Sequence, residues 1–166
     1  EDWRDDWTFG EEATLSLYTP PARNAAFDGA TVLARMKKRF DEYLTHLDFS
    51  QGDYTFFFPP YSALYWNYAF GAGNGETYLE FKAYAERMLL GYENVRIFDF
   101  QNAPFVTDLN NYKDYTHYAP EINDRMLGCF ASGEYLVTEA ASTENLLGAT
   151  QSQVAQLLER YPEIPE

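Results

Sequence analysis

The chain has 166 residues, 46% of them hydrophobic and 18% aromatic, and its 26 acidic and 12 basic side chains give a formal net charge of −14. This length suits one compact domain with a real core, and the aromatic content excludes a disordered or linker protein. The negative charge repels phosphate backbones and anionic lipids, so we expect no nucleic acid partner and no docking to membranes through basic residues.

Few residues in this chain suit a metal site or a covalent crosslink. The single cysteine, Cys129, cannot form an intrachain disulfide, and no zinc site can be built from cysteines. His46 and His117 are the only histidines, which excludes a metal site with several imidazoles. We therefore expect no metal and no other cofactor. No apolar run approaches the roughly 18–20 residues that span a bilayer, so we expect no transmembrane segment.

The first 75 residues predict an irregular lead-in, a helix, a strand and a loop. The lead-in, residues 1–29, starts at Glu1 with neither an initiator methionine nor a signal-peptide pattern, which indicates a mature chain or an excised piece. Residues 30–47 have apolar side chains at steps of three and four, as in an amphipathic helix. The aromatic run YTFFF, residues 54–58, favours a buried strand, and residues 61–75 are predicted to form a loop.

The second half of the chain predicts one more strand among helices. The expected elements are, in order, a helix over 76–92, a strand over 95–100, a loop over 102–113, and helices over 120–130 and 144–161. Pro120 suits a first helical turn, and Thr143 is the expected cap of the last helix.

This order of elements predicts an α/β fold. Two strands separated by a helix form a right-handed crossover unit in which the strands are parallel. Two strands are too few for a stable parallel sheet, because such sheets need more strands and cover on both faces. Either residues 1–29 add a strand, or part of the sheet lies outside this chain.

Asp114 and His117 form an Asp-x-x-His pattern in the stretch NNYKDYTHYAPEIND, residues 110–124. Active groups of parallel sheets collect beyond the carboxyl ends of the strands, and we expect this stretch to meet the loop after Phe58 there. At this spacing a carboxylate can bind one imidazole nitrogen and leave the other as a general base. The alternative interpretation is a surface aspartate beside a histidine that caps or packs a turn.

With these residues, the chain resembles the SGNH/GDSL hydrolase superfamily, in particular the envelope-associated branch with DltD-like and alginate-acetylation-like proteins. In that family an Asp-x-x-His block precedes the C-terminal helix, its aspartate orients the histidine, and the histidine activates a serine. The stretch FFFPPYSALYW resembles the core strand and following loop of members from gut Firmicutes. The resemblance covers roughly residues 30–160 and is most specific over residues 108–123.

The chain departs from the family's pattern at the nucleophile. The family has an N-terminal Gly-Asp-Ser type block after its first strand, and this chain has no such block. Ser16 lacks the glycine and the strand-turn-helix setting, and Ser62 stands where the family more often has an oxyanion-stabilising asparagine. Asn67 and Asn74 are remote candidates for that asparagine. The resemblance therefore predicts the acid–base pair without its serine.

The resemblance implies a three-layer, flavodoxin-like parallel sheet flanked by helices. Residues 1–166 would be the C-terminal portion of a single SGNH-hydrolase-like domain, with the lead-in over 1–29 and the α/β core over 30–161. The implied function is a serine-type esterase or acyltransferase, outside the cytoplasm of a bacterium, that acts on a small acyl ester or an acylated envelope or glycan substrate. His117 would be the base and Asp114 its orienting acid. The candidate substrate-binding residues are Tyr61, Ser62, Tyr65 and Trp66.

Two interpretations without catalysis stay open at this point. One is a binding or assembly module whose aromatic loop engages a glycan or a partner protein, and the other is an inactive fragment of a larger hydrolase. A cation site from Asp108, Asn110 and Asp114 is conceivable, but the stretch lacks the glycine and terminal glutamate of an EF-hand. The glycine-rich residues 71–75 lack the setting of a phosphate-binding loop.

Overall fold

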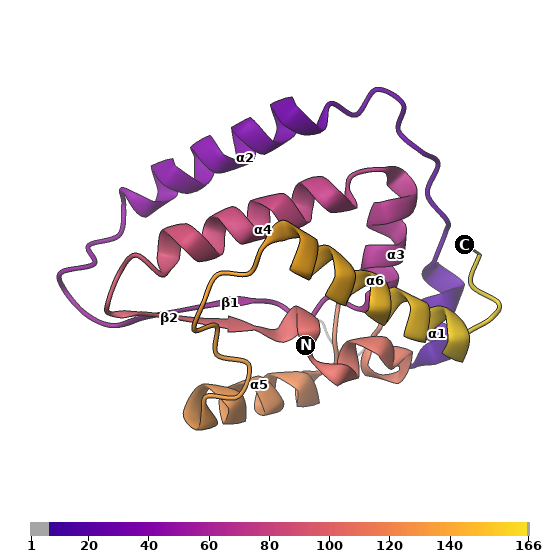
Figure 1. Cartoon of the computed structure of the whole chain (residues 1–166). Helices are drawn as coiled ribbons and strands as arrows, with labels where there is room; N and C mark the ends of the chain where they lie inside the picture. The colour runs from indigo at the N-terminus through magenta and orange to yellow at the C-terminus, as the bar shows by residue number, and fades with distance from the viewer. Residues whose placement is uncertain (1–6, 166) are drawn as a thin grey trace.

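The structure is a computed structural model, and it describes residues 7–165. These residues form a mixed α/β fold of α-helices, short 3-10 helices and a two-stranded sheet (Figure 1). In chain order the elements are α1 (Glu11–Leu17), α2 (Gly29–Leu44), β1 (Tyr54–Phe58), α3 (Ala63–Ala72), α4 (Gly75–Leu89), β2 (Val95–Asp99), η1 (Phe100–Asn102), η2 (Pro104–Thr107), η3 (Leu109–Asn111), α5 (Pro120–Ser132) and α6 (Thr143–Arg160). Over the described part of the chain, no helix is both long enough and apolar enough to cross a membrane.

The two strands are parallel, as predicted, and run in register from Tyr54 opposite Val95 to Phe58 opposite Asp99. On the other edge of β2, the main chain of a later segment binds in the antiparallel direction. Asp99 N donates to Tyr135 O at 2.9 Å, and Val137 N donates to Ile97 O at 2.8 Å. The predicted possibility of a strand before residue 29 is not realised in residues 7–29, where the regular element is the helix α1.

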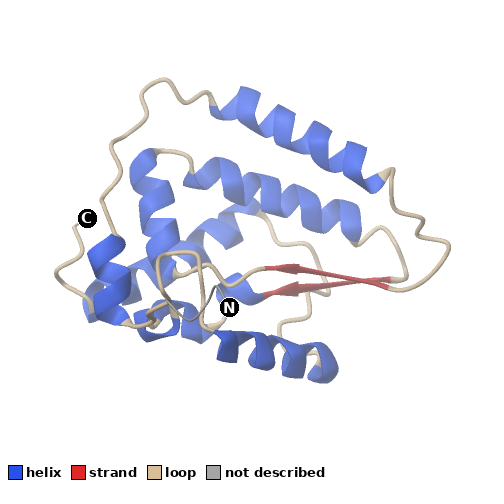
Figure 2. Ribbon diagram, turned by 180° about the vertical axis from the view of Figure 1, so that it is seen from behind, coloured by secondary structure: helices blue, strands red, loops and turns tan. Residues whose placement is uncertain are grey.

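Helices lie on both sides of the strands. Figures 1 and 2 show α4 on one side and α5 on the other, and α2 packs along the outside of α4. Beneath α5 the core is formed by buried side chains of the β2 region and the helix: Phe98, Phe100, Ala103, Phe105, Val106, Ile122, Met126 and Cys129. On the α4 side, Val95 and Ile97 pack with Leu44 and Leu89. Cys129 is therefore a core residue.

Local sequence explains where most helices begin and end. Asp28 caps α2, because its carboxylate accepts a hydrogen bond from Thr31 N at 3.2 Å. Pro120 lies in the first turn of α5, and Gly133, with φ of 82°, ends that helix. The cap of α6 is Ser142 rather than the predicted Thr143, since the Ser142 hydroxyl accepts from Asn145 N at 3.1 Å.

The prediction of a loop over residues 61–75 was wrong, because residues 63–72 form helix α3. Ser62 caps this helix, and Gly73, with φ of 87°, ends it. The apolar side chains of α3 itself lie on all of its faces, so the sequence has no polar face that would reveal a helical period. A helix of this kind is stable only where it is buried. The buried residues of α3 are Ala63, Leu64, Trp66, Ala69 and Ala72.

Candidate active site

The Asp-x-x-His segment forms a closed loop between η3 and α5. Tyr112 and Tyr118 pair across its base, and inside it Lys113 N donates to His117 O at 2.9 Å. The Tyr112 hydroxyl donates to the carbonyl of Pro60 at 2.8 Å. The loop therefore lies beside the segment that follows β1, which confirms that the two loops after the strands meet.

The side chains of Asp114 and His117 contact each other directly. His117 Nδ1 lies 2.7 Å from Asp114 Oδ2. The other carboxylate oxygen, Oδ1, accepts from Thr116 N at 2.8 Å and from His117 N at 2.9 Å. Because an ionised carboxylate only accepts hydrogen bonds, this contact places the imidazole proton on Nδ1. The second nitrogen, Nε2, then has a lone pair that can take a proton.

The same hydrogen bonds keep Asp114 ionised. Partial burial favours the neutral acid, but hydrogen bonds from Thr116 N and His117 N, and then from the two side chains, outweigh this effect and hold the pKa of Asp114 below its usual value. A carboxylate with a lowered pKa is a constant negative partner for an imidazole. The arrangement can therefore orient His117 and stabilise its protonated form during proton transfer.

His117 opens onto a pocket of about 400 Å³ that is mostly aromatic. The side chain of His117 is 56% exposed and that of Asp114 only 22%. The rings of Trp7 and His117 meet edge to face, with centroids 5.3 Å apart. Burial, together with the nearby Tyr61, raises the pKa of Tyr118, so this phenol stays neutral at physiological pH. The residues that line the pocket are Trp7, Pro59, Tyr61, Thr116, His117 and Tyr118.

Of the four predicted substrate-binding residues, Tyr61 lies on this pocket. Tyr65 is partly buried, and its ring contacts that of Tyr61 at 4.8 Å between centroids. Ser62 and Trp66 lie in the interior, 0% and 3% exposed. They are buried because the predicted loop is a helix. Trp7 is a pocket residue that the sequence did not predict, since nothing local connects it to His117.

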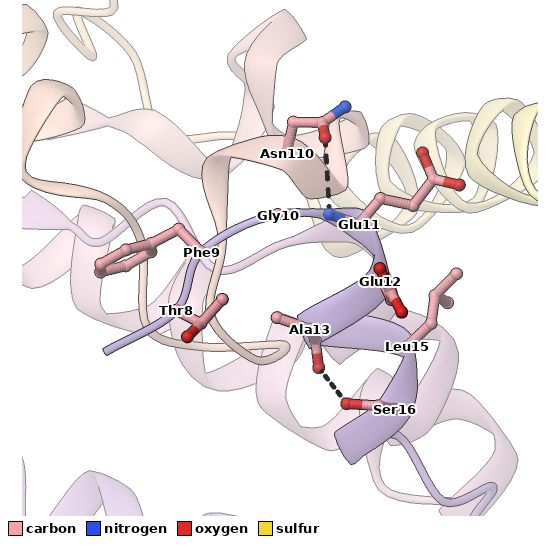
Figure 3. A pocket seen from close by; sticks show the side chains of 9 residues that line it. All are labelled: Thr8, Phe9, Gly10, Glu11, Glu12, Ala13, Leu15, Ser16 and Asn110. Atoms are coloured by element: carbon pink, nitrogen blue, oxygen red, sulfur yellow. Dashed lines mark hydrogen bonds between the residues drawn. The ribbon is translucent and has the colours of Figure 1, made fainter. Parts of the chain in front are cut away.

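Ser16 belongs to a different pocket, of about 1050 Å³, at the start of α1. Figure 3 shows its hydroxyl directed to the carbonyl of Ala13, to which it donates at 2.8 Å. Asn110 lies on the same pocket and accepts from Glu11 N at 3.5 Å. Neither Asp114 nor His117 lines this pocket. Ser16 is therefore an α1 surface residue whose hydroxyl binds its own helix.

The remaining candidate ligands have ordinary protein partners. Asp108 accepts from Asn110 N at 3.1 Å and pairs with Arg160, also at 3.1 Å. Within residues 7–165, no group of three or more histidine, cysteine, aspartate and glutamate side chains could hold a metal ion. His46 is exposed just after the end of α2, which ends at Leu44 and is shorter than the predicted helix over 30–47.

A second polar cluster, not predicted from the sequence, is buried where β2 ends. Lys82 on α4 donates to Asp99 Oδ1 at 2.7 Å and to Gln101 Oε1 at 3.1 Å. One turn along α4, Glu86 is 1% exposed and accepts from Ala141 N at 2.9 Å. Burial raises the pKa of Glu86, although the Ala141 hydrogen bond and Lys82 oppose the shift. The four-residue spacing of Lys82 and Glu86 on one helix face was a signal that could have indicated this cluster.

Comparison of the chain with protein-family models, with curated proteins and with solved structures gave no match. The candidate site is therefore defined by its geometry. Asp114 orients the imidazole of His117, which faces an aromatic pocket beside the residues that follow β1.

Proposed function

We propose that this chain carries the acid–base half of a serine-type esterase or acyltransferase site, in a three-layer SGNH-hydrolase-like domain. The observation that carries the proposal is the 2.7 Å contact between His117 Nδ1 and Asp114 Oδ2, which leaves Nε2 as a proton acceptor beside a pocket. The substrate class proposed with it comes from the resemblance to the SGNH hydrolases, and is an acyl ester, either small or linked to a glycan, in the bacterial cell envelope.

His117 and Asp114 have separate roles in this proposal. Nε2 of His117 takes the proton of a hydroxyl nucleophile as its oxygen attacks the acyl carbon, and later gives that proton to the departing alcohol. Asp114 stays ionised throughout, because its hydrogen bonds hold its pKa low, and it stabilises the imidazolium that forms in between. Tyr61, Trp7 and Tyr118 line the space in which the acyl group would lie.

The nucleophilic serine comes from outside residues 7–165 in this proposal. The Ser62 hydroxyl is buried and donates to the carbonyl of Tyr115 at 2.8 Å. The Ser16 hydroxyl donates to the carbonyl of Ala13. Labelling with a fluorophosphonate probe tests this assignment, because such a probe reacts with activated serines. We expect no labelled serine in this chain, and a label on Ser62 or Ser16 would place the nucleophile here.

Hydrolysis of p-nitrophenyl acetate tests the role of His117 itself, since an oriented imidazole can activate water against an activated ester. We expect His117→Gln to lower the rate at least about tenfold. The chain supplies a matched control, because His46 is the other histidine, is exposed and does not line the pocket. His46→Gln should leave the rate unchanged. Equal rates for the wild-type chain and His117→Gln would sink the catalytic proposal.

A non-catalytic binding module is the second candidate, and the aromatic pocket favours it. The rings of Trp7, Tyr61 and Tyr118 offer flat apolar surfaces on which a sugar ring could stack. The ester assay separates the two candidates, because a binding module needs the aromatic rings and has no use for the Nε2 lone pair of His117.

A further inference from the structure

The loop that holds Asp114 and His117 is attached to the segment after β1 by two sets of buried hydrogen bonds. Ser62 makes the first set, in which its N and its Oγ both donate to the carbonyl of Tyr115, at 3.2 and 2.8 Å. Tyr112 makes the second, in which its hydroxyl donates to Pro60 O at 2.8 Å. Both Ser62 and Tyr112 are 0% exposed. Asp114 lies between the two anchored positions, 112 and 115.

The Ser62 hydroxyl is suited to this place because it can donate and accept at once. It donates to Tyr115 O and accepts from Tyr65 N at 3.4 Å, in the first turn of α3. Alanine at this position would leave the Tyr115 carbonyl with one donor instead of two and would also remove the cap of α3. A single side chain thus connects the start of α3 to the loop that carries the imidazole.

Other hydrogen bonds of the loop lie within it or come from the start of α1. Within the loop, Thr116 N and His117 N donate to the Asp114 carboxylate, and Lys113 N donates to His117 O. These hydrogen bonds hold the loop in shape but do not attach it to the sheet. The base of the loop is held from the other side by α1, because Gly10 N and Thr14 Oγ1 donate to Tyr112 O at 2.8 and 2.9 Å. Among the hydrogen bonds described here, only those of Ser62 and Tyr112 connect the loop to the segment after β1.

We propose that Ser62 is a positioning residue that, together with Tyr112, holds the Asp114–His117 pair at the carboxyl end of β1. Its hydroxyl acts through the Tyr115 carbonyl and takes no part in attack on a substrate. Its importance for catalysis rests on the proposed function, but the positioning itself is a property of the folded chain. It can therefore be tested without any ester turnover.

The test is the ¹⁵N spectrum of the His117 imidazole in the full chain, recorded at about pH 8.5. His46→Gln assigns the signals, because the chain has two histidines. The wild-type chain should show the tautomer with the proton on Nδ1. Ser62→Ala should move the two ring nitrogens towards the averaged shifts of an unconstrained imidazole. It should also speed amide exchange of Thr116 and His117 by about fivefold, the factor for one hydrogen bond of about 1 kcal/mol.

Ser142→Ala is the matched control, because Ser142 also caps a helix but lies on α6. It should cost similar stability and leave the His117 signals and both amide rates unchanged. If Ser62→Ala does not fold, Tyr112→Phe decides, with Tyr54→Phe as its control, since the Tyr54 hydroxyl also donates to a carbonyl, that of Asp48, at 2.9 Å. Wild-type nitrogen shifts and amide rates in the folded variants would overturn the positioning role. The expected spectra together with equal ester hydrolysis by the wild-type chain and His117→Gln would overturn the proposed function alone.

Discussion

The pairs His117–Asp114 and Lys82–Asp99 have the same separation, 2.7 Å between nitrogen and oxygen, in very different surroundings. The side chains of the first pair are 56% and 22% exposed, and those of the second are 5% and 10% exposed. An exposed pair can exchange protons with a substrate, whereas a buried pair has lost its water and must be satisfied within the protein. The distance alone therefore does not distinguish the two pairs, and access to a pocket is the reason for proposing the exposed pair as the one that transfers protons.

The pKa values of the acids in the two regions also shift in opposite directions, although burial favours the neutral form of both. Asp114 is partly buried, yet hydrogen bonds from two main-chain N–H groups lower its pKa. Glu86 is almost fully buried and accepts one main-chain hydrogen bond, from Ala141, and its pKa is raised. The comparison predicts opposite dependences of stability on pH, and variants of each region can separate them.

The largest effect should come from Lys82→Met in the buried cluster. Removing the ammonium leaves the buried Asp99 carboxylate without its cation, which typically costs about 3–5 kcal/mol of unfolding free energy. Equilibrium unfolding in urea measures this loss. The matched control is Lys38→Met, because Lys38 pairs with Glu42 at 3.8 Å on the surface, where both side chains are more than half exposed. That control should change the free energy of unfolding by about 0.5 kcal/mol or less. A similar loss in both variants would contradict the distinction between the two regions.

Glu86→Gln should change how stability depends on pH. Because the folded-state pKa of Glu86 is raised, the folded chain binds this proton more tightly than the unfolded chain. The contribution is complete below the unfolded pKa, near 4.5, and is lost as the pH rises through the folded pKa. The loss is at most about 1.4 kcal/mol per pH unit for one group. Glu86→Gln should therefore gain stability relative to the wild type as pH rises through this window.

Urea unfolding at several pH values above 4.5 checks this expectation. Glu159→Gln is the control, because Glu159 is exposed on α6 and its substitution removes the same charge. A difference between wild type and Glu86→Gln that stays constant with pH would show that the Glu86 carboxyl does not titrate differently in the two states.

The exposed pair was easier to predict from the sequence than the buried cluster. Asp114 and His117 are three residues apart, follow a strand and precede a helix, so their contact depends on local structure. The bond between Lys82 and Asp99 joins a helix to a strand end, so it depends on how α4 packs on the sheet. Ser62 was correctly located in the loop after β1, but its burial follows from α3. That helix was missed because it is apolar all round. Sequence periodicity reveals helices with one polar face and parallel strands joined by crossovers, but not interior helices or nonlocal polar contacts.

Asp114→Asn should have the smallest effect on stability and a large effect on the site. The amide of asparagine keeps an oxygen for Thr116 N and His117 N, so we expect a loss of about 1 kcal/mol at neutral pH. The lowered pKa of Asp114 contributes stability above its unfolded pKa, near 3.8, that is lost as pH falls through the folded pKa. Asp114→Asn should therefore unfold with a flatter pH dependence below pH 3.8 than the wild type, while Asp53→Asn, at an exposed residue, should not.

Asp114→Asn should change the state of the His117 ring more than it changes the stability of the fold. An asparagine oxygen or nitrogen can face Nδ1, so the imidazole is no longer held with its proton on Nδ1, and the ¹⁵N spectrum should show both tautomers. Ester hydrolysis should then fall towards the His117→Gln rate. Lys82→Met should show the opposite pattern. It should lose much stability, while its His117 spectrum, recorded at urea concentrations where the variant stays folded, should be unchanged. If Lys82→Met altered the tautomer as much as Asp114→Asn, the two regions would be one coupled network, and the exposed pair could not be assigned the chemistry alone.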